Sequence, residues 1–360
     1  MTAPMNRREF TSLLLAAGAV PGGSQAADVE QRNLIVNGLD PSAARSEYLD
    51  LLKAGGVSCW YRSEDGAGIE DFASVLTFCD QNAGRIAVAR SVDDIWALHR
   101  QGKMSYIVGW QSAEALALQA SIDPALSHLR AYHELGLRIC GIAYNVANLF
   151  GGGCLEPQVG LTRAGRRLVE EIHRLRIILD VGGHTSEQTS LDALEMSKGV
   201  PVICSHTNIK TLNDNPRNTS DRVIEAIARS GGVIGLSAFN DFHARRRSDA
   251  SVPRTPQVAL DRHLDQYDYL KRLVGVDHIG LGPDFIEGNN GEGVVSPDTT
   301  TMVAEAYSSQ RPWYYVQGFE NIGQLPNVTR GLLSRGWTTT EVHKVLGGNW
   351  LRVYRQIWGR

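Results

Sequence analysis

The chain has 360 residues, of which 42% are hydrophobic and 21% charged, and its formal net charge at pH 7 is −3. This composition is typical of a globular protein with a sizeable core, and the length suits a single α/β barrel domain. Because the net charge is slightly negative and the basic residues are scattered, the sequence argues against nucleic-acid binding. The densest basic run, at 245–247, is interpreted as a solvated loop.

Residues 1–26 are predicted to be an export signal of the twin-arginine type. Arg7 and Arg8 precede an apolar stretch at 10–20, which is about half as long as a membrane span. Small residues at 24 and 26 then match a signal cleavage site. An ordinary secretory signal with a chance arginine pair would lead to the same side of the membrane. We therefore expect a periplasmic or secreted protein with no stable membrane span, whose mature chain at 27–360 is one domain.

Eight short apolar runs alternate with amphipathic helical patterns after residue 30. The runs lie at 34–39, 57–61, 105–110, 138–144, 177–181, 201–205, 233–239 and 279–282. Near-continuous apolar runs are typical of parallel strands that are covered on both faces. Eight such units predict a closed (β/α)8 TIM barrel, with helices such as those at 161–174 and 219–230 between the strands. No glycine-rich nucleotide motif follows any strand, which disfavours an open nucleotide-binding sheet.

Two histidines follow neighbouring predicted strands. His184 comes after the run at 177–181, and His206 closes the run at 201–205. In a TIM barrel the chemistry lies at the C-terminal ends of the strands. Neighbouring parallel strands are ~4.8 Å apart, so two neutral imidazoles there can converge on one transition-metal ion such as zinc. The pattern alone leaves a structural role for the pair open.

Two charged residues also follow predicted strands. Asp284 comes after the run at 279–282 and could be a metal ligand, a general base or an anchor for a substrate ammonium group. A plain N-cap role would look the same in the sequence. Arg217 lies in the loop after the His206 strand, where it could hold a substrate carboxylate through two parallel hydrogen bonds. A solvated loop arginine is the alternative interpretation.

Several segments, in the same order along the chain, resemble the membrane dipeptidase family. They are residues 201–208, 216–218 with Asp221, 276–285, 318–322 and 346–353. The resemblance implies a TIM barrel of the metal-dependent hydrolase type that cleaves dipeptides, often with a D-residue at the C-terminal position, and that holds two zinc ions. It also makes a homodimer a possible assembly.

The resemblance assigns roles to individual residues of this chain. It implies that His184 and His206 are ligands of the second zinc ion, and that Arg217 holds the carboxylate of the substrate. It implies that Asp284 lies beside the substrate amine and the catalytic water. Asn208, in the same segment as His206, is assigned to substrate binding.

The chain departs from the family pattern at the metal centre. Leu39 and Pro41 stand where a His-x-Asp would hold the first zinc ion, and neither side chain can be a ligand. Gln111 replaces the glutamate that bridges the two ions, and a neutral amide lacks the charge that keeps two dications together. Asp40 is one residue out of register, so we expect its side chain to face the other way. The resemblance therefore implies at most one ion, zinc or another divalent metal, held by the two histidines and Gln111.

The leading hypothesis is an exported metallo-dipeptidase-like hydrolase that acts on a dipeptide or a related amino-acyl amide. Asp284 would move the proton and Arg217 would hold a carboxylate. Tyr144, which stands where some family members have a histidine, would donate a hydrogen bond to the developing oxyanion. One alternative is a non-hydrolytic maturation enzyme for a secreted peptide natural product. The other is a non-catalytic binding protein for small zwitterions.

Overall fold

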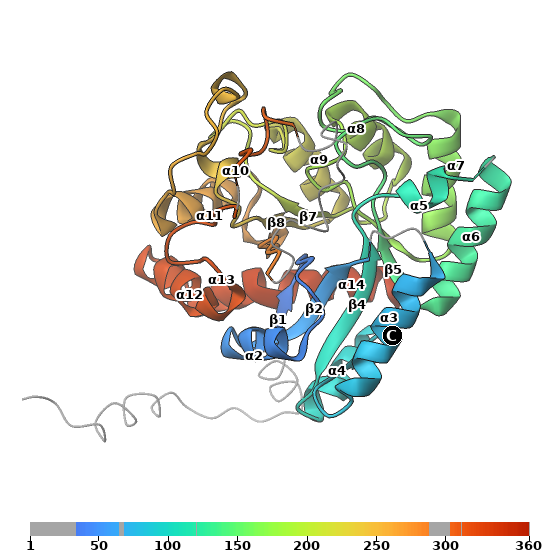
Figure 1. Cartoon of the computed structure of the whole chain (residues 1–360), viewed down its shortest axis with the longest axis horizontal. Helices are drawn as coiled ribbons and strands as arrows, with labels where there is room; N and C mark the ends of the chain where they lie inside the picture. Colours follow the sequence, from blue (N-terminus) through green and yellow to red (C-terminus); the bar gives the residue numbers. More distant parts are fainter. Residues whose placement is uncertain (1–33, 65–67, 120, 288–302, 311, 360) are drawn as a thin grey trace, which may run out of the picture.

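The computed structural model describes residues 34–64, 68–119, 121–287, 303–310 and 312–359 (Figure 1). The export signal expected at 1–26 lies outside the described residues and stays a prediction. Among the described helices, none combines the length and apolar character that a bilayer crossing needs.

Eight parallel strands form a barrel, as predicted. They pair in two sheets, in the order β1-β2-β4-β5-β6 and β7-β8-β9. Backbone hydrogen bonds join the sheets at both edges, from Val181 N to Ile203 O (2.8 Å) and from Gly38 N to Leu281 O (2.9 Å). The strands are β1 (Ile35–Asn37), β2 (Val57–Ser63), β4 (Met104–Trp110), β5 (Leu137–Cys140), β6 (Ile178–Leu179), β7 (Cys204–Thr207), β8 (Ile234–Leu236) and β9 (Ile279–Leu281).

A ninth strand, which the sequence did not predict, lies beside the barrel. Strand β3 (Ile86–Val88) pairs with the first half of β4, whereas β5 pairs with the second half of β4. The two therefore share one edge of β4.

Helices surround the strands, and Figure 1 shows them outside the sheet. Helices α7 and α9 confirm the two helical patterns singled out in the sequence, and α9 begins after the N-cap Ser220 and ends at Gly231, whose φ is 86°. The helices are α2 (Ser46–Ala54), α3 (Ile69–Gln81), α4 (Val92–Arg100), α5 (Glu114–Ala117), α6 (Ile122–Leu135), α7 (Arg163–Arg174), α8 (Glu187–Met196), α9 (Asp221–Ser230), α10 (Asp241–Ala244), α11 (Leu260–Val274), α12 (Leu325–Ser334), α13 (Thr339–His343) and α14 (Asn349–Trp358).

Helix α14 closes the barrel core. Its Trp350 is fully buried in one cluster with side chains of the barrel strands, and its indole Nε1 donates to Leu281 O at 3.2 Å. Glycines leave room for the indole ring: a Cβ at Gly280 would lie 2.6 Å from Trp350 Cε2. The core holds no disulfide, because all five cysteines are buried and free.

We expect Gly280→Ala to lower the free energy of unfolding by about 1–3 kcal/mol, the range for overpacking a tight core. The indole that the new methyl group would meet is completely buried and cannot turn away without cost. Urea denaturation measures the change. Gly84→Ala is the matched control, because a Cβ there meets nothing within 4 Å. Equal stability of both variants would contradict this account of the Trp350 packing.

Candidate active site

A small cavity lies where the strands of the barrel end. Its volume is about 30 Å³, close to the ~30 Å³ that one water occupies in the liquid. It brings together five of the residues singled out in the sequence, namely Gln111, Tyr144, His184, Arg217 and Asp284. Pro41, Phe239, Ile286, Tyr307 and Trp313 complete the wall.

His184 is held between two amide side chains. Its Nδ1 lies 2.7 Å from Asn145 Oδ1, and its Nε2 lies 3.0 Å from Gln111 Oε1. The Asn145 amide is oriented by its other contacts, because its Nδ2 donates to Tyr307 Oη (3.3 Å) and its Oδ1 accepts from Cys154 Sγ (3.3 Å). Burial lowers the pKa of His184 well below 6.5, so the ring is neutral. A neutral ring carries one proton, so it can donate to only one of these two amide oxygens at a time.

His206 lies beside this ring, within strand β7 rather than just after it. The two imidazole centroids are 5.0 Å apart, and burial lowers the pKa of His206 well below 6.5. Its Nδ1 is 2.8 Å from Ser205 Oγ, whereas its buried Nε2 has no hydrogen-bond partner among the described residues. A buried, unpartnered ring nitrogen is the group that a metal ion would satisfy.

The donor set suits one metal ion and not two. Two neutral imidazoles and the Gln111 oxygen are ligands that zinc and similar ions accept. On the side of the first ion, Leu39 is fully buried in the barrel core and Pro41 lines the cavity. No group of three or more His, Cys, Asp or Glu side chains suited to a metal occurs in the described part of the chain. A two-ion centre therefore does not fit these residues.

Asp40 does not replace the missing ligands. Its carboxylate accepts hydrogen bonds from Asn37 Nδ2 (2.8 Å), from Ser42 N (3.0 Å) and from the Tyr48 hydroxyl. Burial raises its pKa to about 6 against the effect of these bonds. The side chain is thus committed to the β1–α2 connection, as expected from its shifted register.

Arg217 presents a buried cation to the cavity. Its side chain is fully buried, and its Nε donates to Tyr307 Oη at 2.8 Å. Both Nη atoms lack a hydrogen-bond partner among the described residues, and the guanidinium carbon lies 5.0 Å from the centre of the Phe242 ring. A buried charge without a counter-ion is costly unless a ligand supplies the counter-charge. The two free Nη groups have the geometry that a carboxylate matches.

Asp284 supplies the opposite charge in the same cavity. Burial raises the pKa of its carboxyl to about 7, although Arg217 acts in the other direction. Its backbone is in the left-handed region with φ 62°, and Asn145 has the same φ. This conformation is uncommon outside glycine, although Asp and Asn tolerate it best, and such residues concentrate at functional sites.

The remaining two predicted residues differ in position. The Tyr144 ring stacks on His184, with centroids 3.9 Å apart and an interplanar angle of 21°. Asn208 lies outside the cavity wall: its Nδ2 is 3.2 Å from Ser237 O and 3.3 Å from His243 Nε2. A direct substrate contact of Asn208 therefore stays a prediction that this geometry does not favour.

Sequence reasoning missed Asn145 and Tyr307, which link the parts of the site. Tyr307 accepts from both Arg217 and Asn145, and Asn145 orients His184. Asn145 directly follows the predicted strand at 138–144, so the strand-end rule could have found it. Tyr307 follows no strand, and its sequence surroundings carry no signal for a role in the site.

Known proteins resemble this chain in sequence and in fold. Residues 58–296 and 312–358 match the family model described as membrane dipeptidase (Peptidase family M19). Dipeptidase tcpJ of Claviceps purpurea is 29% identical over 276 residues, which are 76% of this chain and 56% of that relative, so the chain spans little more than half of it. An amidohydrolase structure from Pseudomonas aeruginosa is 27% identical, with a TM-score of 0.79 over 93% of this chain and 99% of that chain.

A metallopeptidase from Rhodobacter sphaeroides, solved with a phosphinate mimic of the dipeptide L-Ala-D-Ala, shares the fold. Its TM-score is 0.71 at 22% identity, over 90% of this chain and 99% of that chain. The family model covers well over half of the sequence, in agreement with the resemblance of its motifs. The chain belongs to the membrane dipeptidase family, Peptidase family M19.

Proposed function

We propose that the protein is a dipeptidase-like hydrolase that cleaves a dipeptide or a related amino-acyl amide with a free carboxylate. The observation that carries this proposal is the buried guanidinium of Arg217, whose two Nη groups lack partners among the described residues. Asp284 lines the same cavity. One cation and one carboxyl group in a buried site match the two charged ends of a dipeptide. The family membership favours hydrolysis over the alternatives of non-hydrolytic maturation and of binding alone.

The residues of the cavity divide the work between them. Arg217 binds the substrate carboxylate. Tyr307 orients the Arg217 guanidinium and Asn145 orients the His184 ring, and a hydrogen bond joins Tyr307 to Asn145. Asp284, whose pKa is about 7, can accept a proton from water and return it to the leaving amine near neutral pH. A divalent ion held by the two histidines and Gln111 would supply the Lewis acidity that activates water.

Substrate binding requires the cavity to widen. A volume of about 30 Å³ holds one water, whereas a dipeptide has many more atoms. The aromatic side chains of Phe239, Tyr307 and Trp313 form one wall and contact one another, with ring centroids 5.3–6.0 Å apart. We propose that these rings move apart when substrate enters, since active sites often close around their substrates.

The full chain, metallated with zinc or manganese, should be assayed against dipeptides with L- and D-residues at the C-terminal position. Each dipeptide is paired with its C-terminal amide, which removes the charge that Arg217 would bind. We expect cleavage of free dipeptides and much slower cleavage of the amides. A complete lack of cleavage across the panel would refute the proposed function.

The pH profile of kcat/KM should rise through a limb near pH 7. The ionised form of Asp284 binds the substrate amine and accepts the proton, and its fraction falls about tenfold per pH unit below a pKa of about 7. Titration of His184 cannot produce this limb, because burial holds its pKa well below 6.5. Asp284→Asn should lower kcat/KM and abolish the limb. If the limb stays in this variant, another group controls the profile.

We further propose that the protein is exported by the twin-arginine route, on the evidence of Arg7, Arg8 and the short apolar stretch after them.

A further inference from the structure

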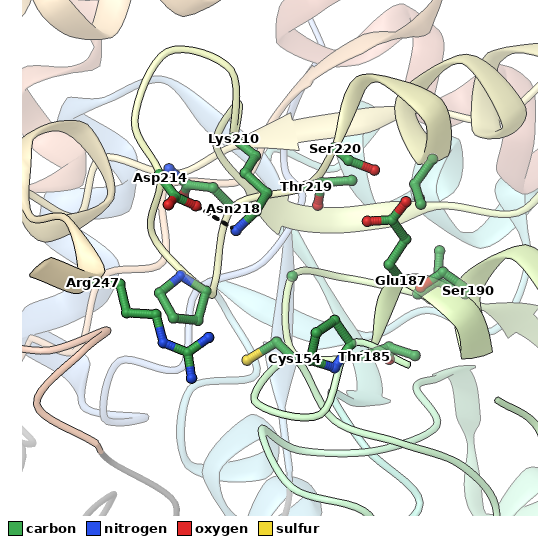
Figure 2. Close-up of a pocket in the computed structure, with 15 residues that line it drawn as sticks. Cys154, Thr185, Glu187, Ser190, Lys210, Asp214, Asn218, Thr219, Ser220 and Arg247 are labelled. Atoms are coloured by element: carbon green, nitrogen blue, oxygen red, sulfur yellow. Dashed lines mark ion pairs between the residues drawn. The ribbon is translucent and has the colours of Figure 1, made fainter. Parts of the chain in front are cut away.

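A second pocket, drawn in Figure 2, is lined by neighbours in sequence of catalytic cavity residues. It has a volume of about 240 Å³, and its wall consists mainly of the loops before α8 and α9 and the first turns of these helices, with Cys154, Pro157 and Arg247 from other segments. Along these loops, neighbouring residues line the catalytic cavity and the second pocket in turn. His184 lines the catalytic cavity, whereas Gly183 and Thr185 line the second pocket. Likewise Arg217 lines the cavity, whereas its neighbours at 216 and 218 line the pocket.

Buried polar atoms in this pocket lack partners. Thr185 Oγ1, Asn218 Oδ1 and Ser220 Oγ make no hydrogen bond within the described structure. The side chains of Thr185 and Asn218 are only 7% and 5% exposed, so bulk water does not readily satisfy them. Native proteins leave few buried polar groups unsatisfied, and each exception calls for an explanation such as a bound water, ion or ligand. Three exceptions around one hollow fit a polar occupant of the pocket.

The charges of the pocket indicate the kind of ligand. Lys210 and Asp214 neutralise each other through an ion pair of 2.8 Å, drawn as a dashed line in Figure 2. Arg247 and Glu187 form no ion pair with any described residue, and Figure 2 shows them on opposite sides of the pocket. The volume of about 240 Å³ is several times what one water needs, so the pocket has room for a small organic ligand. One free cation and one free carboxylate match a small zwitterion.

Arg245 anchors the segment that carries Arg247. The expectation of a solvated basic run at 245–247 is wrong for Arg245, which is 1% exposed. Its guanidinium donates to the backbone oxygens of Val252 (2.7 Å), Ala250 (3.1 Å) and Ala304 (2.7 Å). Arg246 and Arg247 are exposed as expected. The buried neighbour thus fixes the backbone from which Arg247 reaches the pocket.

We propose that this pocket binds a free α-amino acid. Arg247 binds its carboxylate and Glu187 binds its ammonium group. The hydroxyl groups of Thr185 and Ser220 can donate to the carboxylate, and Asn218 Oδ1 can accept from the ammonium. Amino acids are also the products of the proposed hydrolysis, but the second site does not depend on that reaction.

Calorimetric titration of the full chain with individual amino acids at up to ~10 mM tests this site. Glycine, alanine, serine, leucine and glutamate cover the sizes that the pocket admits. We expect at least one of them to bind saturably, and Arg247→Gln and Glu187→Gln each to weaken binding by about tenfold or more, the effect of losing one charge-assisted contact. Arg246→Gln is the matched control, because this neighbour is exposed and does not line the pocket.

Two results would overturn the proposal. One is the absence of saturable binding for every amino acid tested. The other is binding that Arg247→Gln and Glu187→Gln leave unchanged but that Arg217→Met abolishes, which would place the ligand in the catalytic cavity. Because the proposed hydrolysis is assayed separately with dipeptides, its failure and the failure of this site are distinguishable.

Discussion

Arg217→Met is expected to lower kcat/KM for a dipeptide by about 30- to 3,000-fold, with no loss of stability. Removing one partner of a buried, hydrogen-bonded charge pair costs ~2–5 kcal/mol, and each ~1.4 kcal/mol is tenfold. In the free protein, however, the guanidinium forms no ion pair with any described residue, and Asp284 in the same cavity, with a pKa of about 7, is only partly ionised at neutral pH. Methionine keeps much of the buried apolar stem and removes a buried charge that is only partly compensated, which is often neutral or stabilising.

A double comparison isolates this contact. Cleavage of a free dipeptide and of its C-terminal amide should be measured in the parent and in Arg217→Met, together with thermal melting of both proteins. The substitution should affect the free dipeptide far more than the amide, because only the former carries the charge that Arg217 binds. Arg229→Met, at an exposed arginine, controls for the loss of a surface charge. An equal loss on both substrates would show that Arg217 acts through the fold.

The sequence predicted the barrel because its strands are apolar on both faces. Runs such as those at 177–181 and 201–205 are nearly continuous in apolar residues, whereas a strand at the surface would alternate apolar and polar residues. Strand β3 was not predicted, and its pairing with the first half of β4 is a tertiary contact that the sequence pattern does not specify. The packing of α14 against the barrel core was likewise not predicted, since the glycines that leave room for the Trp350 ring lie far from it in the sequence.

The candidate site was predictable where it follows strand ends. His184, Arg217 and Asp284 were found by this rule and by the resemblance, and the structure brings them to one cavity. Tyr307 was not found, because it reaches the site from a segment that follows no strand. Asn208 was assigned to substrate binding, and this stays a prediction; in the structure its Nδ2 contacts Ser237 O and His243 Nε2. Motifs locate a site, but the contacts within it depend on packing.

His206→Ala is expected to lower metal affinity by more than about 100-fold and to reduce dipeptide cleavage accordingly. Loss of an outer partner of a metal ligand already costs ~10–100-fold, and His206 would itself be a ligand through its unpartnered Nε2. Metal content measured by elemental mass spectrometry after dialysis is the primary readout, so the result does not depend on finding the substrate. His278→Ala is the matched control, because this histidine lies away from the cavity, with its Nδ1 2.9 Å from Gly232 O.

Gln111→Glu sharpens the same test. A carboxylate in place of the Gln111 amide, 3.0 Å from His184 Nε2, adds a negative charge to the ligand set and should tighten binding of one ion. It should not create a second site, since buried Leu39 and Pro41 still offer no ligand. We therefore expect about one equivalent of metal in the parent and in Gln111→Glu, and almost none in His206→Ala. Two equivalents in the parent would mean that ligands other than Leu39 and Pro41 complete a two-ion centre. Full retention of metal in His206→Ala would instead assign this histidine a structural role.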